Sequence, residues 1–132
     1  MNQVVAHFLD GRVLKGTSMD VAAGRTLFHI RSTDGKNEEV NLKDLKALFF
    51  VRSLQGDPKR SDAREPDADD SRVRGSTPIT VRFADNETIV GLTNSYPPSR
   101  SYFFIVPVDP GSNNIRILVN RDAVVHMESP TG

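Results

Sequence analysis

Apolar and polar residues alternate along a short segment near the N-terminus. Val4, Ala6 and Phe8 share one face of an extended chain, and the residues between them share the other. The same alternation returns in residues 79–84, where a phenylalanine again ends the apolar face. We therefore expect two β-strands whose phenylalanine-bearing face is buried, which places His7 on an outward face.

These two strands open a repeat that extends over most of the chain. Seven positions are identical at a constant offset of 75 residues, without a gap. A match of this length indicates a duplication rather than chance similarity. The identical pairs are Phe8/Phe83, Asp10/Asp85, Gly16/Gly91, Arg25/Arg100, Phe28/Phe103, Ile30/Ile105 and Asp34/Asp109.

Glycine and asparagine mark how each copy turns. Asp10-Gly11 and its counterpart with Asn86 predict tight type I′ hairpin turns, because Gly and Asn tolerate positive φ. Gly16 and Gly91 then fall inside the returning strand, where glycine is favoured if the strand bends or packs closely. We expect both glycines to let a small sheet curl.

Each copy contains signals for five short strands, with one helical turn before the fifth. That order is typical of an SH3-like or Sm-like barrel. The sequence therefore predicts an all-β protein of two tandem five-stranded SH3-like or Sm-like barrels packed as a pseudo-dimer. The expected third, fourth and fifth strands are residues 27–31, 39–42 and 46–51, and residues 102–106, 115–119 and 123–127.

The predicted organisation has three parts. Residues 1–51 form the first barrel repeat, with its barrel from residue 3 onward, and residues 78–132 form the second, with its barrel ending at residue 127 and a short C-terminal tail after it. Residues 52–77 are charged and almost free of apolar side chains, which predicts a flexible linker. Leu54 is expected to pack on the first barrel.

Two family resemblances follow from these residues. The run from Asp10 to Gly16 resembles the opening hairpin of Sm-like proteins, which are small barrels that form rings and bind RNA. The sequence of residues 45–58, together with the Phe-x-Asp-Gly motif at residues 8–11, is similar to that of a bacterial domain family without assigned function. This second resemblance spans nearly all of each repeat and implies a bacterial source and a barrel fold. It brings no catalytic residues with it.

Composition and charge narrow the possible partners. Lys+Arg and Asp+Glu both number 17, so the chain has no net field to attract nucleic acid. No cysteine is present, which excludes disulfides and thiolate metal sites. No secretory signal or membrane-length apolar run is visible, so we expect a cytoplasmic protein without a membrane partner.

Catalytic and metal chemistry find little support in the residue pattern. The three histidines are His7, His29 and His126, and a metal site needs at least three converging ligands. The second copy replaces the first two with Arg82 and Phe104, so no paired site is repeated. Serines are plentiful, but none lies in a nucleophile-elbow pattern. We predict no cofactor, no metal and no enzyme activity.

The charged segment between the repeats suggests a ligand-binding alternative. It resembles the split-arginine and Asp-x-Ser-x-x-Gly elements of PilZ domains, which hold cyclic di-GMP, although its glycine comes one residue late. Paired arginines bind phosphates and stack on guanine. The alternative function is therefore a ligand or RNA sensor, of a cyclic dinucleotide or a short RNA, that uses Arg60, Arg64, Arg72 and Arg74.

A row of apolar side chains provides the main functional candidate. Tyr102, Phe104 and Val106 share the face of the third strand opposite Phe103. Leaving them in water would cost about 25 cal/mol per Å². Either they bury against the other barrel or a second subunit, or they form a groove for an extended peptide that adds a strand. Tyr96, beside two prolines, could add a rigid recognition loop.

The leading prediction is accordingly a non-catalytic adaptor or regulatory module. It binds a protein partner, or a second copy of the chain, rather than nucleic acid. The predicted binding surface consists of Tyr96, Tyr102, Phe104 and Val106.

Overall fold

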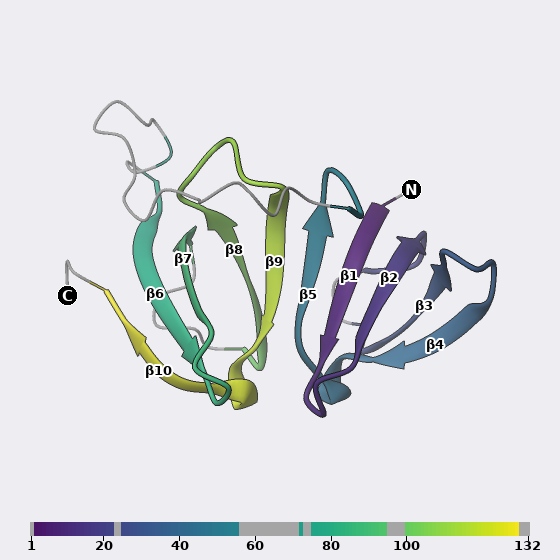
Figure 1. Ribbon diagram of the computed structural model, residues 1–132. Helices are drawn as coiled ribbons and strands as arrows, with labels where there is room; N and C mark the ends of the chain where they lie inside the picture. The colour runs from purple at the N-terminus through teal and green to yellow at the C-terminus, as the bar shows by residue number, and fades with distance from the viewer. Residues whose placement is uncertain (1, 23–24, 56–71, 73–74, 95–99, 130–132) are drawn as a thin grey trace.

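Ten β-strands and two single turns of 3₁₀-helix make up the regular structure in the part of the chain that the computed structural model describes, residues 2–22, 25–55, 72, 75–94 and 100–129. The all-β prediction is confirmed (Figure 1). The first half contains β1 Asn2–Phe8, β2 Val13–Ser18, β3 Leu27–Ser32, β4 Asn37–Asn41, η1 Leu42–Asp44 and β5 Leu45–Val51. The second half contains β6 Thr77–Phe83, β7 Thr88–Thr93, β8 Tyr102–Pro107, β9 Asn114–Asn120, η3 Arg121–Ala123 and β10 Val124–Glu128.

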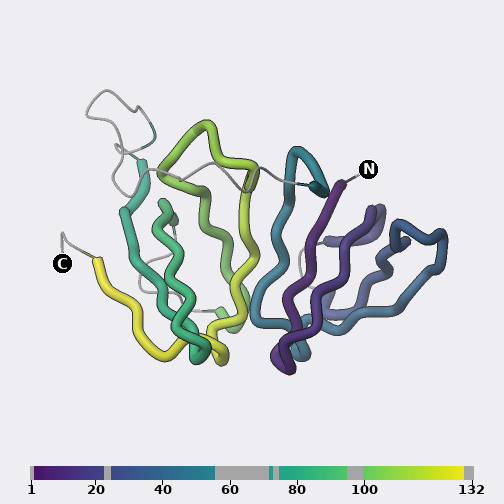
Figure 2. Tube along the Cα trace, in the orientation of Figure 1, coloured from purple at the N-terminus to yellow at the C-terminus, as the bar shows by residue number. Residues whose placement is uncertain are grey.

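All ten strands belong to one antiparallel sheet, in the order β10-β6-β7-β8-β9-β5-β1-β2-β3-β4. β5 pairs with β9, so the two halves meet edge to edge, as the trace in Figure 2 also shows. This arrangement differs from the expected pair of separate barrels, because the sheet is continuous through the middle and ends at β10 and β4. The reason lies in β5, in which all seven residues are buried. A strand that is apolar on both faces belongs in the interior of a sheet, not at its edge.

The sequence repeat is also a structural repeat. Within each half the five strands follow one order, β5-β1-β2-β3-β4 and β10-β6-β7-β8-β9. The registers agree as well, since Val4 lies opposite Gly16 and Ile79 lies opposite Gly91. The fixed offset in the sequence therefore corresponds to equivalent positions in space.

The hairpin turns are of a different type from the one expected. A type I′ turn needs positive φ at both central residues, but only Gly11, at 94°, and Asn86, at 70°, have it in these two turns. Gly11 N donates to Phe8 O at 3.0 Å, and Asn86 N donates to Phe83 O at 2.9 Å. Each connection is thus a three-residue loop that ends in a left-handed residue.

The two strand glycines are required by close packing, as predicted. A Cβ at Gly16 would lie 2.1 Å from Arg31 O, and a Cβ at Gly91 would lie 2.9 Å from Val106 O. Both positions therefore let the third strand of each half approach the second more closely than a side chain would permit.

Two hydrophobic cores lie on opposite faces of the central strands. In β5, Leu48 and Phe50 belong to the first core, whereas Ala47, Phe49 and Val51 belong to the second. The two halves must therefore curl over opposite faces of the shared strands. The first core is Val4, Ala6, Phe28, Ile30, Val40, Leu42, Leu45, Leu48, Phe50 and Leu118. The second is Val5, Ala47, Phe49, Val51, Ile79, Val81, Phe83, Phe103, Ile105, Ile117, Val119 and Ala123.

Polar contacts fasten the junction between the halves. Buried Asn120 donates through Nδ2 to Leu45 O at 2.9 Å. Lys46 Nζ lies 2.8 Å from an Asp85 carboxylate oxygen and 2.5 Å from a Glu87 oxygen. Burial acts to lower the pKa of Lys46, but the hydrogen bonds that its ammonium donates to these two carboxylates, together with their negative charge, outweigh burial and raise that pKa.

The start of the predicted linker is docked on the second half. Arg52 N donates to Asn113 O at 2.8 Å, and Asn113 Nδ2 donates to Ser53 O at 2.9 Å. We had expected Leu54 to pack on the first half, but it packs against the second core. The reason is that β5 leads directly into the junction, where the second core lies.

No helix among the described residues is long and apolar enough to span a membrane.

Candidate functional site

β7 and β8 separate over part of their length. Their pairing consists of Gly91 with Pro107 and Leu92 with Val106. Beyond these pairs, Thr93 Oγ1 donates to Phe104 O at 3.1 Å in place of a ladder bond. Alternate residues of an antiparallel strand direct their backbone groups to opposite neighbours, so two residues of β8, at 102 and 104, face the side where pairing with β7 has ended.

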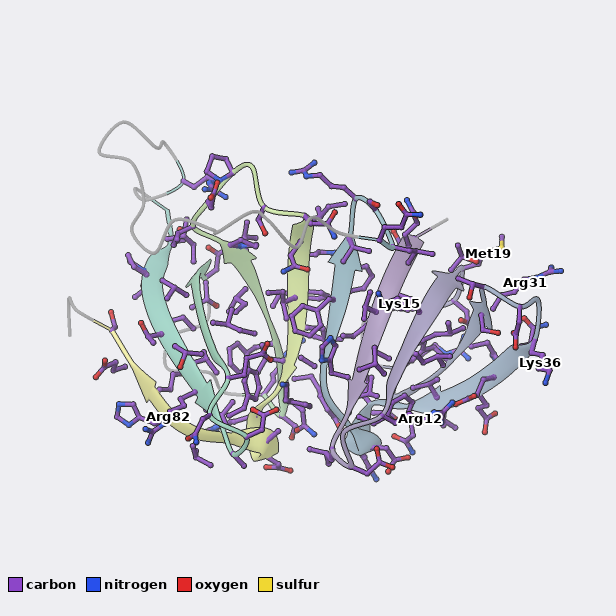
Figure 3. All side chains as sticks on the ribbon, in the orientation of Figure 1. Arg12, Lys15, Met19, Arg31, Lys36 and Arg82 are labelled. Carbon is purple, nitrogen blue, oxygen red and sulfur yellow. The ribbon has the colours of Figure 1, made fainter. Side chains whose placement is uncertain are left out.

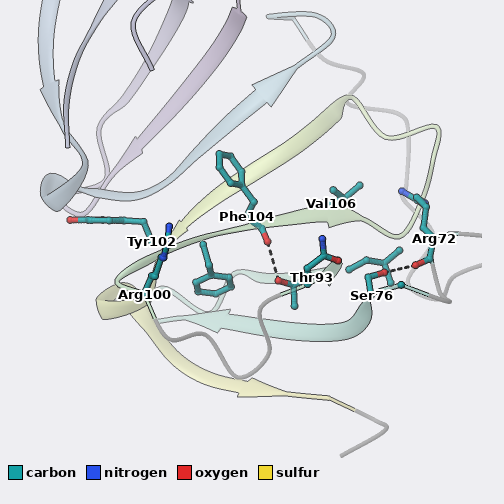
Figure 4. A pocket seen from close by; sticks show the side chains of 11 residues that line it. Arg72, Ser76, Thr93, Arg100, Tyr102, Phe104 and Val106 are labelled. Atoms are coloured by element: carbon teal, nitrogen blue, oxygen red, sulfur yellow. Dashed lines mark hydrogen bonds between the residues drawn. The ribbon is translucent and has the colours of Figure 1, made fainter. Parts of the chain in front are cut away.

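A hollow of about 790 Å³ lies along this opening (Figure 4). We call it the β7–β8 groove. Aromatic, aliphatic, hydroxyl and guanidinium groups line it, and no carboxylate is among the lining residues that the structure describes. Its principal lining residues are Arg72, Ser76, Leu92, Thr93, Arg100, Tyr102, Phe104 and Val106.

The apolar row predicted on β8 lies in this groove, and its members differ in burial. Tyr102 is half-buried and packs against the first core, so it meets the other half of the molecule. Burial raises the pKa of its hydroxyl, and the negative charges of Asp122 and Asp44 add to that effect. Phe104 remains 40% exposed, and Val106 is half-buried. Of the two roles left open by the sequence, burial against the other half holds for Tyr102, and peptide binding stays a prediction.

The predicted arginines are placed differently. Arg72 donates to Pro107 O and to Val108 O, both at 3.1 Å, and so supports the end of β8. In Figure 4 it lies beyond Val106, at the opposite end of the row from Arg100. The other three predicted ligand-binding residues, Arg60, Arg64 and Arg74, lie outside the described residues, as does Tyr96.

Arg116 on β9 is an element of the site that the sequence pattern did not reveal. Its guanidinium carbon lies 4.4 Å from the Phe50 ring centroid and 4.6 Å from that of Phe104. The two ring centroids are 6.1 Å apart, so both aromatic rings contact one cation. Arg116 reaches this position because β9 pairs with β5, where it lies opposite Phe50. The visible signal was an arginine among the apolar residues 115–119 of β9.

The second and third strands of the first half separate in the same way, but different side chains lie at their opening. β2 and β3 pair only at Gly16 with Ser32 and at Thr17 with Arg31. Asp20 fills the space beyond, because its carboxylate accepts from His29 N at 2.9 Å and lies 2.8 Å from His29 Nδ1.

These hydrogen bonds, from the His29 side chain first and its backbone second, lower the pKa of Asp20 to about 2. His29 is the counterpart of Phe104 in the repeat.

The histidines do not converge. His7 is half-buried with its ring centroid 4.5 Å from that of Phe49, which corrects the expected outward position. The central strands are covered on both faces, so a residue opposite the first core meets the second half. Burial is the main cause that lowers the pKa of His7. His126 lies 3.2 Å from a Glu128 oxygen. Within the described ranges, no three His, Asp or Glu side chains are grouped to hold a metal ion.

The chain belongs to DUF6982, a family of unknown function whose model matches residues 1–129. The match covers both halves and the segment between them, so the duplicated pair is the unit that the family shares. Comparison with curated proteins and with solved structures gave no match.

Proposed function

We propose that this protein is a non-catalytic binding module that takes up an extended segment of a partner protein in the β7–β8 groove. The observation that carries the proposal is the separation of the two strands after Leu92 and Val106. It leaves one side of Tyr102 and Phe104 without a paired strand among the described residues. An edge of this kind binds a peptide by continuing the hydrogen-bond ladder.

The chemistry of the groove supports an extended ligand. Phe104, at 40% exposure, and half-buried Val106 offer apolar surface for alternate side chains of an added strand. Thr93 and Asn94 add polar groups at its border. The volume of about 790 Å³ lies within the range of ligand-binding hollows, about 300–1,000 Å³. Main-chain bonds would supply affinity and the apolar row would supply selectivity.

The proposal has a structural part as well. Each half is an open SH3-like or Sm-like unit, and the shared strand order, the close-packed glycine in the second strand and the 3₁₀ turn before the fifth support this relationship. An adaptor or regulatory role, a bacterial source and a cytoplasmic location stay predictions. The sensor role of the linker arginines is an alternative prediction, in which Arg72 already binds two carbonyl oxygens.

Peptide selection tests the proposed function. A random peptide library displayed on phage is selected against the purified full chain, and the enriched peptides are synthesised for titration. Phe104→Asp should weaken their binding at least about tenfold, because it places a carboxylate on the apolar row. Leu27→Asp is the matched control, since Leu27 is 44% exposed on β3 at the first-half position equivalent to Tyr102.

The same peptides test strand addition directly. An added strand uses every second N–H of the peptide in its pairing with β8. N-methylation at one parity of positions should therefore abolish binding, and methylation at the other should leave it nearly unchanged. Failure to enrich any peptide, or equal binding to the wild type and to Phe104→Asp, would contradict the proposal.

A further inference from the structure

Arg116 is held in a defined orientation beside the groove. Its guanidinium contacts the rings of Phe50 and Phe104, at 4.4 and 4.6 Å from their centroids. A planar guanidinium that rests on aromatic rings keeps its N–H groups available at its edge for a carboxylate. Because the rings restrict the side chain, less rotamer entropy is lost when a ligand binds.

Asp122 and Asp44 lie near enough to Tyr102 to raise its pKa, but within the described residues neither is paired with an arginine beside the groove. Neither Arg116 nor Arg100 forms an ion pair with any residue that the structure describes. By contrast, Arg12 is paired with Glu38, with 2.6 Å between Nη2 and Oε2. The chain as a whole has no net charge. Arg100 at the groove and Arg116 beside it are therefore two guanidinium groups without an ion-pair partner in the described part of a chain that has no general excess of positive charge.

We propose that the segment bound in the β7–β8 groove is acidic, with a Glu or Asp side chain that pairs with Arg116. This inference rests on the proposed function. A strand added to β8 would lie about 4.8 Å from it, and β9 lies one spacing further on the opposite side. A glutamate of the bound segment whose side chain lies on the same face as Phe104 can reach across that ring to the Arg116 guanidinium. The residues two positions before and after it in the segment contact the apolar row.

A protein ligand fits these observations better than a nucleic acid does. Arginine and aromatic rings together also bind single-stranded RNA. However, no described strand pairs with the groove side of β8 at Tyr102 and Phe104, and such an edge matches the backbone of a peptide and not that of an oligonucleotide. An added strand would replace the bond that Phe104 O accepts from Thr93 Oγ1.

Three matched peptide pools test the inference. All share one alternating apolar pattern, and their polar positions carry only Glu, only Gln or only Lys. We expect the wild type to prefer the Glu pool over the Gln pool by about fivefold, in line with about 1 kcal/mol for an exposed charge pair. The preference should fall as salt rises from 50 to 500 mM, because the pair is solvent-exposed.

Arg116→Met identifies the residue responsible. Methionine preserves contact with the rings and removes the charge, so the Glu-to-Gln preference should approach one while binding of the Gln pool is retained. The control is Arg82→Met, because Arg82 is exposed on β6 far from the β5–β9 junction (Figure 3). It should leave the preference unchanged.

The outcomes separate this inference from the proposed function. Equal binding of the Glu and Gln pools, or an unchanged preference in Arg116→Met, overturns the acidic ligand and leaves the groove standing. Absence of binding by all three pools, together with no enriched peptide from the library, overturns the groove itself. Tight binding of a uridine decamer that is lost in Arg116→Met, with no binding of the Glu pool, overturns the peptide in favour of RNA.

Discussion

The two halves of the molecule contain the same opening between their second and third strands, and they close it differently. β2 and β3 separate after two paired positions, and β7 and β8 separate after the two equivalent ones. In the first half, the Asp20 carboxylate fills the opening by accepting from the His29 backbone and contacting the imidazole. In the second half, Phe104 takes the place of His29 and a groove with an apolar row lies along the opening. Ser95, the counterpart of Asp20, lies outside the described residues.

This comparison shows how a duplicated backbone can acquire two roles. Both halves keep a glycine where the second and third strands pair, and the close approach of the strands there depends on Gly16 and Gly91. The two openings differ at two positions of the repeat, because Ser95 and Phe104 stand where the first half has Asp20 and His29. A histidine can contact a carboxylate through its ring, whereas a phenylalanine cannot. The residues at these two positions therefore differ in chemistry while the strand order of the two halves is the same.

The largest expected effect concerns the backbone feature that the halves share. Gly16→Ala should lower the free energy of unfolding by about 3 kcal/mol, because its Cβ would lie 2.1 Å from Arg31 O. Gly91→Ala should cost less, about 1–2 kcal/mol, since the nearest atom, Val106 O, would be 2.9 Å away. Urea titration of both variants measures the difference.

Gly75→Ala is the control for these substitutions. A Cβ at Gly75 would meet nothing within 4 Å, so the change in unfolding free energy should stay within about 0.5 kcal/mol. If Gly16→Ala and Gly91→Ala also stayed within that range, the close approach of the second and third strands would not be what requires glycine there.

Much of the fold could be predicted from the sequence because its signals are local. Alternation located the strands, and the constant offset located their equivalents. The junction could not be predicted in the same way, because which edge strands pair depends on the whole sheet. The run of apolar residues in β5 was nevertheless a signal, since a strand buried on both faces has no place at an edge. The prediction of type I′ turns was wrong because Asp10 does not have the positive φ that such a turn requires.

The candidate site was predictable on one strand only. Tyr102, Phe104 and Val106 follow from alternation within β8. Arg116 required knowledge of the β5–β9 register, which places it opposite Phe50. A site assembled across the junction is determined by strand pairing between residues distant in sequence, and no local pattern encodes that pairing.

An intermediate effect is expected where Asp20 closes the first opening. Asp20→Asn should cost about 1 kcal/mol near pH 7, the usual value for a hydrogen bond to a charged group reduced for its 29% exposed side chain. The folded-state pKa of about 2 lies below the ordinary 3.8, so the carboxylate stabilises the fold above pH 3.8. That contribution is lost as the pH falls through about 2.

Thermal unfolding of wild type and Asp20→Asn across the acid range checks this dependence. The difference between them should be constant above about pH 4 and shrink toward pH 2. A difference that stayed constant down to pH 2 would show that the charge of Asp20 does not hold the opening closed.

The smallest expected effect comes from making the two third strands alike. His29→Phe places at position 29 the residue found at 104, and the change in unfolding free energy near pH 7 should be within about 0.5 kcal/mol because the side chain is half exposed. Asp20 would lose its contact with the imidazole. It would still accept from the backbone N–H of residue 29, which phenylalanine also has, and from the Ser18 hydroxyl at 3.3 Å. Its pKa should therefore rise from about 2 without reaching 3.8, as a carboxyl titration by NMR would measure. An unchanged pKa of Asp20 would mean that the backbone N–H of residue 29, not the histidine side chain, is what lowers that pKa.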